Sequence, residues 1–163
     1  MMYDGLGHGH GANAATTAAV RPFAASEADR LENVIAELDE SLKGTRGAAA
    51  LLIEVPRKDA NPVTAIGLGN ISAELVSRDR ARRIVSHDGM IGRGLRKSKV
   101  LSYEDMPWTI IVVCSDGLRH RWDFSDYPGL AAREPMTIAA TLWRDFRRGT
   151  DDSAIAVIKA RAR

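Results

Sequence analysis

One short stretch constrains the fold of this chain more than any other: an unbroken apolar run that ends in a small polar turn. Five apolar residues, Ile110–Cys114, are followed directly by Ser-Asp-Gly. Most of the five are β-branched and the run is short, so it predicts a strand buried on both faces. Asp116 then follows a rigid element, and Gly117 allows the backbone to turn sharply. Acids that bind metals or act in catalysis are often placed in this way.

Two other acidic positions have a similar setting. Asp4 lies near the start of the chain, before a glycine-rich loop, and Asp151 and Asp152 precede the strand-like stretch Ala154–Lys159. Because an Asp-Gly pair alone is a common turn, the pair itself is weak evidence. The shared setting beside expected strand ends is what leads us to predict that Asp4, Asp116 and Asp151 converge on a metal site.

Composition narrows the class of protein. A length of 163 residues predicts a single domain with a real core. The hydrophobic fraction of 45% and charged fraction of 27% are ordinary for a soluble globular protein. The net charge of +2 argues neither for nor against nucleic acid. Only 6% of residues are aromatic, so a base-stacking platform is not expected and we predict no nucleic-acid partner.

The single cysteine and the apolar pattern indicate the compartment. Cys114 cannot form an internal disulfide, which predicts a reducing cytoplasm. We interpret it as a small core hydrophobe rather than a nucleophile. No apolar stretch has the length of a membrane span and no signal peptide is visible, so no membrane partner is predicted.

Periodicity along the chain predicts helices, then strands, then a helix and a last strand. Apolar residues at helical spacing predict helices in three regions, Ala12–Phe23, Leu31–Leu42 and Ala139–Phe146. Strands are predicted at Ala48–Val55, Val63–Leu68, Ile71–Ser77, Arg82–Ser86, Val100–Tyr103, Ile110–Cys114 and Ala154–Lys159. Short turns between consecutive strands favour an antiparallel meander, whereas the stretch before Asp4 is too short to predict a strand. The fold class is therefore α+β, with helices outside antiparallel sheet.

Several motifs are excluded or left open. The glycines at 5, 7 and 9 do not make a dinucleotide fingerprint, because His10 stands where the next glycine is required. No Walker A motif exists. His8 and His10 are more typical of polar residues in a glycine-rich loop, with metal binding as the alternative.

Four motifs in a fixed order resemble the PPM-type metal-dependent serine/threonine phosphatases. They are Asp4-Gly5-Leu6-Gly7-His8-Gly9, Gly67-Leu68-Gly69-Asn70-Ile71, Ser115-Asp116-Gly117-Leu118 and Asp151-Asp152-Ser153-Ala154-Ile155. The Gly-His-Gly form of the first motif, together with His87–Gly92, is similar to the bacterial SpoIIE/RsbX-like branch. The resemblance covers nearly the whole chain, and it implies two stacked antiparallel β-sheets flanked by helices.

The resemblance also implies a role for each acid. Asp4 would bridge two Mn²⁺ or Mg²⁺ ions, and the carbonyl of Gly5 would join it on one of them. Asp116 and Asp151 would hold the other ion, with Asp152 as the alternative to Asp151. Hard divalent cations take such oxygen ligands. Two metals roughly 3.5–4 Å apart activate water and stabilise in-line displacement at phosphorus.

The chain departs from the family pattern at two points. The larger eukaryotic relatives carry a histidine, proposed as the general acid, where Leu6 stands, so His8 or His10 becomes the candidate catalytic substitute. Family members also begin with strands upstream of Asp4 that carry another acid near the metals. We therefore expect residues 1–163 to form one domain that lacks these N-terminal strands, with impaired activity and an exposed sheet edge open to association.

Two functions follow from the resemblance. The first is a phosphoserine/phosphothreonine protein phosphatase that acts on a regulatory phosphoprotein, similar to an anti-sigma-factor antagonist, in a partner-switching or stressosome-type stress-response pathway. The second is a weak or inactive binding module of the same fold, or a fragment of a longer protein. A basic loop with Arg93, Arg96 and Lys97 is a candidate docking surface for an anionic partner, with a solvated loop as the alternative.

Overall fold

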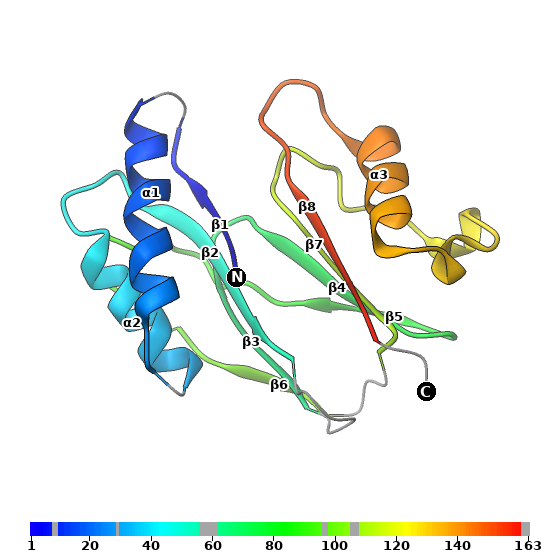
Figure 1. Cartoon of the computed structure of the whole chain (residues 1–163), viewed down its shortest axis with the longest axis horizontal. Coiled ribbons are helices and arrows are strands. Elements are labelled where there is room, and N and C mark those ends of the chain that lie inside the picture. The colour runs from blue at the N-terminus through cyan, green and yellow to red at the C-terminus, as the bar shows by residue number, and fades with distance from the viewer. Residues whose placement is uncertain (8–9, 29, 56–61, 96–97, 105–107, 161–163) are drawn as a thin grey trace. The chain divides into compact units, whose positions relative to one another are not determined.

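A computed structural model gives the structure of the protein and describes residues 1–7, 10–28, 30–55, 62–95, 98–104 and 108–160. The chain divides into two compact units, each made of two segments. The first unit is Met1–Ile71 with Val85–Asp105, and the second is Ser72–Ile84 with Met106–Arg163. Each unit contains one antiparallel sheet and its own helices, as Figure 1 shows.

The first unit is built on the sheet β1-β2-β3-β6, in which all neighbours are antiparallel. Its elements are β1 (Met2–Gly5), α1 (His10–Ala25), α2 (Leu31–Ser41), β2 (Ala48–Glu54), β3 (Val63–Leu68) and β6 (Leu101–Tyr103). Helices α1 and α2 lie together against this sheet (Figure 1). Alternate residues of β2 contact the helices, as the period of a strand requires. The shared core comprises Ala19, Ile35, Leu38, Leu42, Ala48, Ala50, Leu52, Ile66, Leu68 and Ile91.

The second unit is built on the sheet β5-β4-β7-β8, also antiparallel throughout. Its elements are β4 (Ser72–Val76), β5 (Ala81–Ile84), β7 (Ile110–Cys114), α3 (Pro135–Phe146) and β8 (Ile155–Lys159), with short 3₁₀ turns at Phe124–Asp126 and Leu130–Ala132. All of β7 is buried, between β4 on one side and β8 on the other. Helix α3 begins at a proline, which suits the first helical position, and packs against β8.

Most of the predicted elements are confirmed within a few residues. The α+β class is confirmed: the described residues form two antiparallel four-stranded sheets and three α-helices. The buried strand at Ile110–Cys114 is confirmed at the predicted bounds, and Val100–Tyr103 does form an edge strand, as β6. The prediction of one domain over residues 1–163 stays a prediction.

Two expectations were wrong. The stretch before Asp4 is a strand, β1, because Met2–Gly5 pairs residue by residue with Leu51–Ala48 of β2. A continuous meander is also wrong, because β3 and β4 follow each other in the chain but lie in different sheets. Local propensity could not reveal either feature, because both depend on which distant strand provides the hydrogen-bonding partner.

Candidate functional site

Asp4 lies near the end of β1, where a strand end was predicted. It is opposite Ala49 of β2, and the buried Gly5 is opposite Ala48. The ladder continues one residue further, because the Leu6 amide donates to the Gly47 carbonyl at 3.1 Å. The half-buried Asp4 is therefore held by backbone pairing on one side of an edge strand.

Asp116 follows the central strand of the second unit and sits in a tightly bonded turn. The buried Ser115 fixes this turn from three directions. Its amide donates to the Ala154 carbonyl at 3.0 Å, its hydroxyl oxygen accepts from the Ala154 amide at 3.0 Å, and its carbonyl accepts from the Leu118 amide at 3.2 Å. Asp116 is half-buried beside these bonds. Its backbone therefore has rigid support from both β7 and the start of β8.

Gly117 brings the two acidic segments of the second unit together. A Cβ atom built on Gly117 would lie 2.1 Å from the Asp152 carbonyl oxygen, a distance that no side chain tolerates. Glycine is thus required here by the close approach of another backbone rather than by an unusual φ angle. Asp151 and Asp152 are exposed, and the Asp151 carboxylate accepts the Asp152 amide at 2.8 Å. The Asp116 turn and the Asp151–Asp152 segment are therefore neighbours.

The chemistry of these residues fits a hard divalent cation, because carboxylate and carbonyl oxygens are the donors that Mg²⁺ and Mn²⁺ prefer. Within the described residues, no three histidine, cysteine, aspartate or glutamate side chains form a metal-binding group. Asp4 belongs to the first unit and Asp116 to the second, so their common site stays a prediction. His8 lies outside the described residues, and only the backbone of His10, at the start of α1, is described.

Cys114 agrees with its interpretation as a core residue. It is fully buried at the end of β7. Burial, with smaller contributions from the charges of Glu74 and Asp116, raises the pKa of its thiol to about 12. The thiolate required of a nucleophile is therefore absent at neutral pH.

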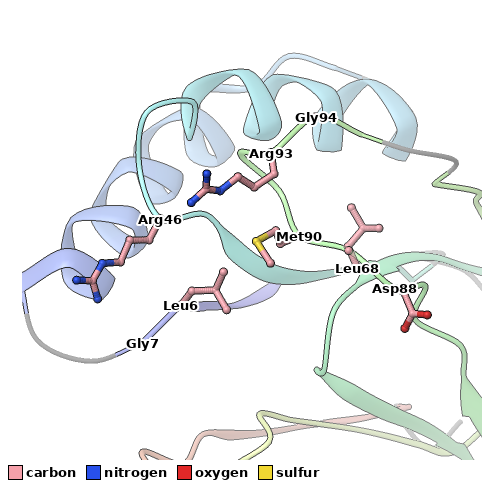
Figure 2. Close-up of a pocket in the computed structure, with 9 residues that line it drawn as sticks. Leu6, Gly7, Arg46, Leu68, Asp88, Met90, Arg93 and Gly94 are labelled. Atoms are coloured by element: carbon pink, nitrogen blue, oxygen red, sulfur yellow. The ribbon is translucent and has the colours of Figure 1, made fainter.

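The first unit contains a cavity of about 760 Å³, and its lining includes Leu6 and Gly7, the two residues that follow Asp4 and Gly5 in the chain. Figure 2 shows its lining, which combines the apolar side chains of Leu6, Leu68 and Met90 with the guanidinium groups of Arg46 and Arg93. The cavity is completed by Gly7, Asp88, Gly89 and Gly94. Within the described residues, no ion pair engages either arginine. Arg93 was predicted as part of a basic surface, whereas Arg96 and Lys97 lie outside the described residues.

A buried carboxylate positions the loop that carries Arg93. Asp39 of α2 is 6% exposed, and one of its oxygens accepts the amides of Gly92 at 2.6 Å and Gly94 at 3.3 Å. Both glycines have positive φ, and a Cβ on Gly92 would lie 2.9 Å from Leu42. Sequence analysis missed Asp39, although an acid between Leu38 and Leu42 on the buried side of a helix was the available signal.

The chain is similar to known proteins in its fold rather than in its sequence. No protein-family model matches the chain, and no curated protein sequence does. A solved chain from work on the bacterial stressosome, described as a modular system adapted to control secondary messenger signalling, is 24% identical with a TM-score of 0.82; the match covers 95% of this chain and 81% of that one. RsbX in complex with magnesium is 18% identical with a TM-score of 0.75, covering 95% of this chain and 76% of that one.

The serine/threonine phosphatase PstP/Ppp of Mycobacterium tuberculosis is 14% identical with a TM-score of 0.74, covering 95% of this chain and 85% of that one. Identities this low carry the fold and not the activity. Among the described residues, none of the helices combines the length and the apolar character needed to cross a membrane. The chain has the α+β fold, with two antiparallel four-stranded sheets and three described helices, that PPM-type phosphatases also have.

Proposed function

We propose that this chain is a metal-dependent phosphoserine/phosphothreonine protein phosphatase. The observation that carries the proposal is the contact of the Asp116 turn with the Asp151–Asp152 segment at Gly117, in a chain with the fold of known phosphatases. Asp4, the Gly5 carbonyl, Asp116 and Asp151 would hold Mn²⁺ or Mg²⁺, with Asp152 as the alternative to Asp151. When bound, such cations polarise phosphoryl oxygens and lower the pKa of water.

Ser115 and Gly117 would orient the acidic segments of the proposed metal site. Ser115 anchors the Asp116 turn to Ala154, so the backbone that carries the Asp116 carboxylate is held in place. The absence of a side chain at Gly117 keeps the Asp152 backbone next to that turn. His8 and His10 remain the candidates for protonating the leaving group, in place of the family histidine at the position of Leu6.

The proposed substrate is a phosphorylated regulatory protein of a partner-switching pathway in the cytoplasm. RsbX and the stressosome chain, which share the fold, support this class of partner. The second candidate is a weak or inactive regulatory module of the same fold. Leu6, where a general acid stands in larger relatives, and the position of Asp4 on an edge strand favour that alternative.

The test is hydrolysis of a phosphothreonine peptide and of p-nitrophenyl phosphate in Mn²⁺ by Asp116→Asn. This change keeps the size of the side chain and removes a negative charge from the proposed metal site. We expect kcat/KM to fall by at least about 100-fold, since even residues behind a metal ligand often contribute about 10–100-fold. Asp79→Asn, an exposed change in the β4–β5 turn, is the matched control and should retain full activity. Equal activity of both variants would refute the assignment of Asp116.

A further inference from the structure

The second unit contains a basic cavity that the proposed metal site does not use. It has a volume of about 600 Å³ and is lined by Arg119, His120, Arg121, Phe146 and Arg148. None of these described lining residues is acidic. A volume in this range accommodates a ligand much larger than a single inorganic ion.

Backbone bonds hold the two basic segments side by side. Leu118 and Arg147 form an antiparallel bridge. On either side of it, the Arg119 amide donates to the Phe146 carbonyl and the Arg148 amide donates to the Gly117 carbonyl, each at 2.9 Å. Leu118 is fully buried and anchors this short ladder in the core. The arginines are therefore presented by a preorganised backbone.

Asp145, the acid that precedes the lining residue Phe146, already has partners. One oxygen of Asp145 accepts from Arg144 at 2.6 Å, and the other accepts from the Tyr127 hydroxyl at 3.0 Å. In the described part of the chain, no hydrogen bond or ion pair engages the guanidinium of Arg121 or Arg148. These two exposed cations are therefore available to an anionic ligand.

Two further groups, the Arg119 guanidinium and the His120 imidazole, line the cavity. The Arg119 guanidinium donates to the Asp145 carbonyl at 3.2 Å, at the C-terminal end of α3, where cations are favoured. Burial, followed by the charges of Arg83, Arg148 and Arg121, holds the pKa of His120 below its usual value. The imidazole is thus neutral near pH 7, and the positive potential comes from arginines.

We propose that this cavity docks an acidic segment of the protein substrate, whose Asp or Glu carboxylates pair with Arg121 and Arg148 while Phe146 provides an apolar wall. Guanidinium groups match carboxylates in shape as well as charge. Arg119, which lines the cavity, follows Asp116 of the proposed metal site by only three residues. The cavity and the proposed metal site would therefore bind parts of the substrate that are close together in the substrate's sequence. This inference rests on the proposed phosphatase function and adds a substrate preference to it.

The experiment compares two phosphothreonine peptides with the same core, one flanked by glutamates and the other by glutamines. Two exposed guanidinium–carboxylate pairs should lower KM for the glutamate peptide by about 3- to 30-fold at low salt, and the preference should shrink as salt is added. The double variant Arg121→Gln/Arg148→Gln should abolish the preference and leave kcat for p-nitrophenyl phosphate unchanged. Arg78→Gln, which removes one positive charge from the exposed β4–β5 turn, is the control for loss of charge away from the cavity.

Binding is measured separately, by fluorescence anisotropy of labelled, non-phosphorylated glutamate and glutamine peptides in EDTA. This readout survives if the chain hydrolyses nothing, so failure of the phosphatase proposal and failure of the docking proposal are distinguishable. Weaker binding of the glutamate peptide by the double variant, but not by Arg78→Gln, supports docking. Equal binding of both peptides, unchanged binding by the double variant, complete displacement by an equimolar amount of inorganic phosphate, or equally tight binding of an oligouridylate of the same charge would overturn the proposal.

Discussion

The two units support their acidic residues in different ways. In the first unit, Asp4 lies on β1, a strand of four residues that pairs, within the described part of the chain, with β2 on one side only. In the second unit, Asp116 follows β7, which is wholly buried and paired on both sides. The loops of the two units are also held differently. The Arg93 loop depends on one buried side chain, Asp39, whereas the ladder around Leu118 is held by backbone bonds. The Asp-Gly motifs at positions 4 and 116 are thus held by strands that differ in burial and in the number of paired neighbours.

Gly117→Ala should produce the largest effect, because the new Cβ would meet the Asp152 carbonyl oxygen, a backbone atom that cannot rotate away. Overpacking of this kind costs about 3 kcal/mol of unfolding free energy. We expect activity to fall as well, since the Asp116 turn must move. Gly7→Ala in the first unit is the comparison: its Cβ would lie 3.0 Å from the movable end of Arg46, at a φ of +82°.

Denaturant unfolding and phosphopeptide hydrolysis measure both effects. Gly7→Ala should cost about 1 kcal/mol, from the left-handed backbone alone. Gly129→Ala, also at positive φ but with open space around it, is the control for backbone strain without a clash. A Gly117→Ala protein as stable and active as Gly129→Ala would show that the Asp116 turn is not tightly packed.

Asp39→Ala tests the dependence of the Arg93 loop on one side chain. It removes the acceptor of the Gly92 and Gly94 amides and should lower the free energy of unfolding by about 2 kcal/mol. Asp39→Asn keeps an acceptor oxygen and should cost less. Hydrogen exchange at the two glycine amides reports the loop directly, and unchanged protection in Asp39→Ala would contradict this account.

The smallest effect expected is a pH dependence from His120. Its pKa is lowered in the folded protein, chiefly by burial and then by the charges of Arg83, Arg148 and Arg121. The unfolded chain therefore binds a proton first as the pH falls, so this residue reduces stability below about pH 6.5 and has no effect well above it. NMR titration should give a higher pKa for His120 in Arg121→Gln/Arg148→Gln. The same His120 pKa in both proteins would contradict the contribution of the Arg121 and Arg148 charges.

The features predictable from sequence were those encoded in one continuous stretch. The run Ile110–Cys114 indicates a buried strand because its apolar, β-branched residues are contiguous. The strand β1 was missed because the stretch before Asp4 is too short to show a strand pattern, and its conformation comes from pairing with β2. Asp116 and Asp151 were predicted as metal ligands from the strand ends expected beside them, and that assignment stays a prediction. The need for glycine at position 117 depends on the path of the Asp152 backbone.

The arginine sites were harder to predict, because their members are distant in sequence. Arg46 and Arg93 line one cavity, yet 46 residues separate them. Arg121 and Arg148 share the other cavity only because Leu118 bridges to Arg147. Basic residues at such separations are indistinguishable from solvated surface charges until the strand pairing is known.

The central claim is that the acids of this chain hold a divalent cation that is required to hydrolyse a phosphoprotein. The most direct measurement follows phosphothreonine-peptide hydrolysis by the whole chain as Mn²⁺ is removed with EDTA and then restored. We predict that activity is lost with the metal and returns with Mn²⁺ or Mg²⁺. The fold should persist without the metal, because the core of each unit is formed by apolar side chains. Full activity in excess EDTA, or no hydrolysis at any Mn²⁺ concentration, would contradict the claim.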